Sequence, residues 1–103
     1  MPQNRILIVG TIRIPPGALE RARPAMAAMI HASRAEAGCL AYSYAEDVLE
    51  PGLIRVTEIW ESRAALSAHF ESAHLRRWRD SWEALGVHDR RLAAYEIDAE
   101  EQV

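Results

Sequence analysis

The sequence predicts an α+β protein with the ferredoxin-like order strand–helix–strand–strand–helix–strand (βαββαβ) and a four-stranded antiparallel sheet. Two observations carry this prediction. Apolar residues alternate along four short segments, and they recur at helical spacing in the two longer segments between them. The chain has 103 residues, 50% hydrophobic and 26% charged, which suits one domain with one core. We therefore expect residues 1–103 to form a single domain whose tail, 99–103, is frayed.

The first half of the chain is expected to hold a strand, a helix and a second strand. Residues 5–14 are a predicted strand, because isoleucine recurs there at alternate positions. A helix is expected from Ala18 to about Glu36, with a kink at Pro24, whose missing N–H removes one helical hydrogen bond. Residues 39–47 follow as a strand with large side chains on one side.

The second half is expected to hold a strand, a helical region and a last strand. Residues 53–61 are predicted to pair antiparallel with the preceding strand, because only a short turn separates the two. Ser62 is a suitable N-cap for a helix that runs through Phe70, and a second helical segment begins near Ala73. The last strand is expected near residues 91–98.

Two helices cover only one face of such a sheet, so the other face needs a cover of its own. Tyrosines and valines of the strands are expected on this open face. A second copy of the chain is the simplest cover, and the sequence therefore predicts a homodimer formed through the open sheet face.

Composition and charge exclude several classes of protein. The longest apolar run, residues 6–12, is far shorter than the roughly 20 residues of a membrane span, and no secretory leader precedes it. We expect a cytoplasmic protein with no membrane partner. A single cysteine excludes an internal disulfide, and no Cys/His spacing indicates a metal site. The net charge of −3, with carboxylates spread among the arginines, argues against a nucleic-acid partner.

Three segments carry a resemblance to a known family: residues 36–42 (EAGCLAY), 56–62 (VTEIWES) and 64–70 (AALSAHF), the last continuing to His74. In order and spacing they resemble the antibiotic biosynthesis monooxygenase superfamily, above all its small quinol-monooxygenase-like members. The resemblance implies a dimeric α+β barrel, in which two sheets pack face to face. It also implies oxidation of phenols, hydroquinones or anthrones by dioxygen without metal, flavin or other cofactor.

Oxygenation of this kind needs a base, and histidine has a pKa that suits proton exchange near neutral pH. His69 is the first candidate for the catalytic base, because it lies beside Phe70 at the edge of the apolar helix face. His74 is the second, as a supporting proton carrier at a helix start, where the neutral ring is favoured. The alternatives are a hydrogen-bonded histidine at a helix border for His69, and a capping or solvent-exposed one for His74.

Aromatic side chains and one carboxylate complete the predicted site. Trp78, Tyr42 and Tyr44 are expected to hold a planar substrate, with Trp60 as a further aromatic contact. Packing in the core, or at the dimer interface for the tyrosines, is the alternative. Glu58 lies among apolar residues of its strand and needs a partner, either a structural ion pair with an arginine or hydrogen bond to the backbone, or a catalytic histidine that it orients.

We therefore expect a cofactor-independent monooxygenase that oxidises a quinol, anthrone or related phenolic aromatic with dioxygen. Its partners would be a second copy of the chain and a small aromatic molecule. A non-catalytic module of the same fold that binds aromatic ligands is one alternative. An isomerase or cyclase that works by acid–base chemistry without oxygen is another, since all three need an apolar pocket and a proton-transfer residue.

Overall fold

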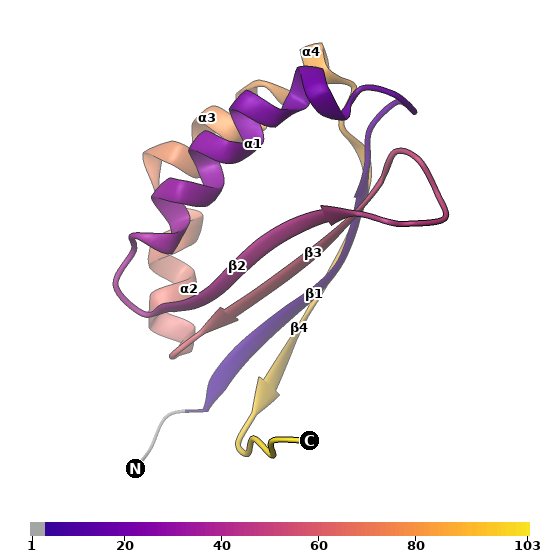
Figure 1. Ribbon diagram of the computed structural model, residues 1–103. Helices are drawn as coiled ribbons and strands as arrows, with labels where there is room; N and C mark the ends of the chain where they lie inside the picture. The colour runs from indigo at the N-terminus through magenta and orange to yellow at the C-terminus, as the bar shows by residue number, and fades with distance from the viewer. Residues whose placement is uncertain (1–3) are drawn as a thin grey trace.

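The computed structural model describes residues 4–103 and confirms the predicted α+β fold. Four antiparallel strands form one sheet in the order β2-β3-β1-β4, and the helices lie together on one of its faces (Figure 1). The elements in chain order are β1 (Arg5–Arg13), α1 (Leu19–Arg34), β2 (Cys39–Glu46), β3 (Leu53–Trp60), α2 (Arg63–Phe70), α3 (Ala73–Asp80), α4 (Trp82–Leu85) and β4 (His88–Ile97). The second helical region is therefore divided into three short helices.

Local chemistry accounts for most of these boundaries. The hydroxyl oxygen of Ser62 accepts a hydrogen bond from the Ala65 N–H and caps α2, as the sequence predicts. Ser72 caps α3 in the same way, and this second cap creates the break after α2. Pro24 lies inside α1, which is one continuous helix. The last strand begins at His88, three residues earlier than predicted.

The core lies between the helices and the sheet face that they cover. Alternate residues of the central strands, Ile6 and Ile8 of β1 and Val56 and Trp60 of β3, are buried against the helices. The α1 helix contributes two methionines and an alanine from one stripe, and it packs against β2 and α3. This packing places α2 and α3 over the sheet with the turn that follows α1 beside them.

The opposite face of the sheet has no cover within residues 4–103, but its composition differs from the prediction. Strand register places Leu7 between Ile59 and Tyr95, all on the open face, and Tyr95 is 53% exposed. Tyr42 and Tyr44 were expected there and instead lie on the helix-covered face, because they pair with Glu58 and Val56 of that face. Two residues opposite each other across paired strands always share a face.

None of the helices in residues 4–103 has the length and apolar character needed to cross a bilayer.

Candidate active site

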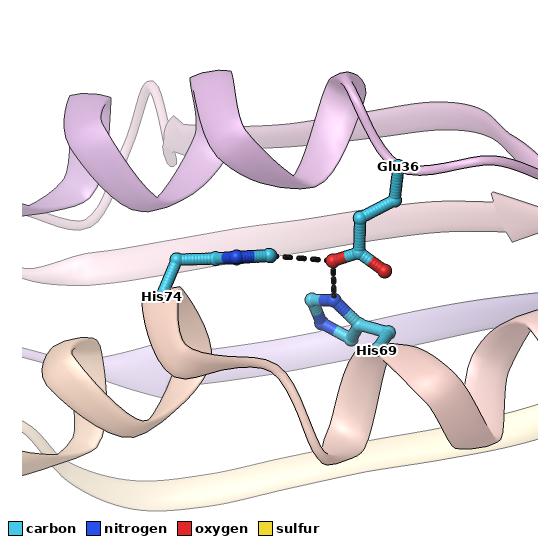
Figure 2. A group of neighbouring side chains, drawn as sticks. All are labelled: Glu36, His69 and His74. Atoms are coloured by element: carbon cyan, nitrogen blue, oxygen red, sulfur yellow. Dashed lines mark hydrogen bonds and ion pairs between the residues drawn. The ribbon is translucent and has the colours of Figure 1, made fainter.

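Two histidines converge on a single carboxylate oxygen where α1, α2 and α3 meet (Figure 2). The His69 Nδ1 atom lies 2.7 Å from Glu36 Oε1, and the His74 Nε2 atom lies 2.5 Å from the same oxygen. His69 is in the last turn of α2, His74 in the first turn of α3, and Glu36 in the turn after α1. Hydrogen bonds between a carboxylate and imidazole N–H groups are charge-assisted, and such bonds are short and strong.

The turn after α1 must pass close to α2 for this contact to form. Gly38, at a φ of +83°, allows that approach, because a Cβ atom there would lie only 2.7 Å from the Ala65 Cβ. The Gly38 carbonyl also accepts a hydrogen bond from the Glu61 N–H at 2.8 Å, which ties the turn to the end of β3. The Glu36 N–H donates to the Ser33 carbonyl and the Glu36 carbonyl accepts from the Cys39 N–H, so backbone hydrogen bonds hold Glu36 in this turn.

His69 is the most enclosed member of this Glu36–His69–His74 cluster, with 1% of its surface exposed. Its ring lies 4.6 Å from that of Trp60 and 5.4 Å from that of Tyr42, measured between centroids. Because its Nδ1 atom is bonded to Glu36, the Nε2 atom is the ring nitrogen left for another partner. His74 is less enclosed, with 16% of its side chain exposed.

A cavity of about 20 Å³ lies beside His69, between α2, α3 and the sheet. That volume holds about one water molecule and is far below the roughly 300–1,000 Å³ of typical small-molecule sites. Five predicted site residues line it: Tyr42, Tyr44, Glu58, His69 and Trp78. Two others do not line it: Trp60 is fully buried against the His69 ring, and His74 lines a separate hollow between α1 and α3.

The cavity wall also contains aromatic and charged residues that the sequence did not predict for the site: Phe70, Arg79, Trp82 and Arg90. Trp82 follows Trp78 at helical spacing; it is half-buried, packs against the core and lines the cavity. Glu36 was also missed. It belongs to the segment that resembles the family, yet only the folded turn brings it to the histidines.

Glu58 has a different partner from those considered in the sequence prediction. Its Oε1 atom accepts a hydrogen bond from the Trp60 indole N–H at 3.0 Å, and burial raises the pKa of its carboxyl group. The carboxylate bonded to the histidines is Glu36, which therefore takes the orienting position that Glu58 was considered for.

The two tyrosines of the cavity keep their protons at neutral pH. Burial raises the pKa of Tyr44 to about 12, and it raises the pKa of Tyr42 further, with the neighbouring Tyr44 and Glu58 adding to the rise. Both hydroxyl groups therefore keep the proton that a hydrogen-bond donor needs.

The Glu36–His69–His74 cluster also has the composition of a metal site. The three ligand atoms lie within 4.8 Å of one another, and two imidazoles with one carboxylate suit divalent transition metals. Spacing along the sequence did not indicate this group, because its members are 33 and 38 residues apart. The distances in the structure are those of hydrogen bonds between the ligands themselves.

The fold is that of a small α+β protein, and in this chain it holds a buried, carboxylate-bound histidine between helices and sheet. The model of the antibiotic biosynthesis monooxygenase family matches residues 5–81, and the chain belongs to this family.

The chain is also similar to solved structures and to a protein of related sequence. A candidate antibiotic biosynthesis monooxygenase from Deinococcus radiodurans is similar at 26% identity and a TM-score of 0.86, covering 95% of this chain and 97% of that one. A Pseudomonas aeruginosa protein is similar at 28% identity and a TM-score of 0.77, covering 98% and 99%. An uncharacterized Synechocystis sp. protein is 31% identical over 89% of this chain, which spans 63% of that relative.

Proposed function

We propose that this chain is a cofactor-independent oxygenase that acts, as a homodimer, on a quinol, anthrone or related phenolic aromatic. The observation that carries the proposal is the hydrogen bond between His69 Nδ1 and Glu36 Oε1 beside the cavity. A carboxylate that accepts the Nδ1 proton fixes the tautomer in which Nε2 is the basic atom, and it stabilises the imidazolium that forms.

The chemistry begins with removal of a proton from the substrate by His69. For an anthrone, the proton leaves the ring methylene carbon, and the resulting carbanion is electron-rich enough to reduce dioxygen. The carbon–oxygen bond then forms, His69 returns its proton to give a hydroperoxide, and loss of water leaves a carbonyl. One oxygen atom enters the product and the other leaves as water, so no external reductant is needed.

His74 and Glu36 connect the buried His69 to solvent. Both histidines share one Glu36 oxygen, and the side chains of His74 and Glu36 are each 16% exposed, whereas that of His69 is 2% exposed. Transfer along short hydrogen bonds suits a proton carrier. Glu36 acts in this scheme as a positioning residue for His69.

Aromatic walls suit a planar substrate, although the cavity must widen to admit one. Tyr44 and Trp78 lie edge-on with ring centroids 6.0 Å apart, and Tyr42 stacks on Tyr44 at 5.8 Å. Phe70 at the rim is 47% exposed and Trp82 is half-buried, so rotation of these two side chains is the least costly way to open the space.

Oxygen uptake by metal-free, flavin-free protein tests the proposal. With hydroquinones and anthrones as substrates, we expect uptake above autoxidation that falls by about 100-fold or more in His69→Ala, since a general base contributes at least that factor. His31→Ala is the matched control, because His31 is exposed on α1. Glu36→Gln is expected to lower kcat with little change in KM.

The other outcomes separate the alternatives. Uptake that is unaffected by His69→Ala contradicts the assignment of the base. Aromatic binding without uptake favours a binding module, or an isomerase or cyclase if the substrate is rearranged. Activity lost on chelation and restored by a divalent metal favours a metal-dependent oxygenase, which the ligand set of Glu36, His69 and His74 makes the strongest rival.

A further inference from the structure

We infer that the cavity recognises an aromatic substrate that carries an anionic oxygen group such as a carboxylate, which Arg79 and Arg90 bind at the cavity wall. This inference depends on the proposed function only in placing the substrate at that cavity. Two independent features support it: unpaired arginines and unpaired indole N–H groups on the same wall.

The first feature is the pair of arginines. Most arginines of residues 4–103 make an ion pair or hydrogen bond, such as Arg63 with Glu96 and Arg34 with the Tyr42 carbonyl. Within that part of the chain, those with neither are Arg76, Arg77, Arg79 and Arg90. Two of these four line the cavity, although the chain has more carboxylates than arginines. Guanidinium groups match carboxylate oxygens in charge and geometry.

The second feature is the pair of indole N–H groups. Trp78 Nε1 and Trp82 Nε1 are buried and have no hydrogen-bond acceptor among residues 4–103, and both residues line the same cavity. The Trp78 N–H is near enough to the Tyr44 hydroxyl to favour its ionised form, but outside hydrogen-bond geometry. Buried donors without an acceptor are rare in folded proteins, and here they indicate a ligand that brings an acceptor.

The arginines and the indole N–H groups come from three separate elements, and the fold brings them to one cavity wall. Trp78 and Arg79 lie on α3, Trp82 on α4 and Arg90 on β4. Of these, Trp82 and Arg90 lie beyond the residues that the family model matches. Glu58 lies on the same wall, and Arg90 is one of the cationic groups that favour its ionised form. A bound carboxylate would compete with Glu58 for Arg90, so Arg79 is the better placed of the two for the ligand alone.

Binding measured without oxygen tests the inference separately from the oxygenase chemistry. The probes are 2,5-dihydroxybenzoate and its methyl ester, which share the hydroquinone ring and differ in charge. By anaerobic titration calorimetry we expect the acid to bind about 10-fold more tightly than the ester, as a charge-assisted bond to arginine predicts. Added salt should weaken binding of the acid and leave that of the ester unchanged.

Variants assign the effect to the cavity wall. Arg79→Gln should remove most of the preference for the acid and Arg90→Gln a smaller part of it, whereas Arg76→Gln, on the same helix as Arg79 but outside the cavity, should keep it. Trp82→Phe retains a ring but lacks the N–H, and it should weaken binding of the acid more than that of the ester.

Each outcome bears on one proposal at a time. Equal affinity for acid and ester overturns the inference, as does an equal loss in Arg76→Gln, which would indicate only general attraction by the arginines of α3. Arginine-dependent binding of the acid with no oxygen uptake in air supports the inference and contradicts the proposed oxygenase. Oxygen uptake with neutral quinols but no preference for the acid supports the proposed oxygenase and contradicts the inference about the arginines.

Discussion

At the scale of single residues, the site is defined by where polar groups are buried and what satisfies them. Glu36 satisfies two histidines with one oxygen, and Glu58 is bonded to the Trp60 indole. The two carboxylates therefore have different roles. Glu36 is bonded to groups that can carry positive charge, whereas the closest partner of Glu58 is neutral, which leaves the cost of burying its charge largely uncompensated.

Glu58 predicts a pH dependence of stability. Its pKa is raised by burial and by Glu36, against the hydrogen bond from Trp60 and the charges of His69 and Arg90, so its protonated form is favoured in the folded state. Below the pKa that Glu58 has in the unfolded chain, its contribution to the free energy of unfolding is fully present. That contribution is lost as the pH rises through the higher pKa of the folded state. Glu58→Gln removes this loss of stability at higher pH, because glutamine does not ionise, and its side-chain oxygen still accepts the hydrogen bond from Trp60.

Urea unfolding at pH 4 to 8 measures the effect. The free energy of unfolding of Glu58→Gln should exceed that of the unmodified chain at neutral pH, by about 1.4 kcal/mol for each unit of raised pKa. The difference should shrink towards pH 4. Glu83→Gln, at an exposed position of α4, is the control and should show no such trend. A difference that is constant with pH would contradict the argument.

At the scale of secondary-structure elements, the break between α2 and α3 sets the geometry of the histidines. Ser72 accepts a hydrogen bond from the Leu75 N–H at 3.3 Å, and its hydroxyl group donates to the His69 carbonyl at 2.7 Å. One side chain thus ends α2 just after His69 and starts α3 just before His74. A single continuous helix would have fixed the two histidines at a different rotation about one axis.

Replacement of Ser72 tests this element. Ser72→Ala removes the cap of α3 and should lower the free energy of unfolding by about 1 kcal/mol. Ser67→Ala, at an exposed position inside α2, is the matched control and should change stability little. Urea unfolding of both variants at one pH makes the comparison. Equal stability of the two variants would show that the cap contributes nothing to the break.

At the scale of the whole molecule, the open sheet face has no partner in residues 4–103. Strand register places Ile59, Leu7 and Tyr95 side by side on it, with Val9 two residues along β1 from Leu7, and all four side chains are at least partly exposed. Aromatic and aliphatic groups of this kind are typical of the buried centre of a homodimer interface. We propose that two sheets pack through this face, as the sequence predicts.

Sedimentation of the intact chain tests the dimer. Ile59→Glu places an unpaired carboxylate at the centre of the proposed interface, and burial of such a charge should weaken association by about 100-fold or more. Ser67→Glu adds the same charge on the helix-covered side and should sediment like the unmodified chain. A monomeric unmodified chain, or a dimer that survives Ile59→Glu, would contradict this interface.

The sequence by itself determined the elements of this protein, because their signals are local. Alternating isoleucines predicted β1, helical spacing predicted α1 through Pro24, and Ser62 predicted the start of α2. It also supplied His69 as a candidate, along with the aromatic residues that lie beside it in the fold.

Only the tertiary structure decided which of these residues meet. Glu36 reaches His69 and His74 across 33 and 38 residues, through a turn that packs on α2. Arg90 joins the cavity from the last strand, and pairing with β3 turned Tyr42 to the helix-covered face. Such contacts depend on strand register and helix packing, which no local pattern encodes, because each is settled by the burial of the whole core at once.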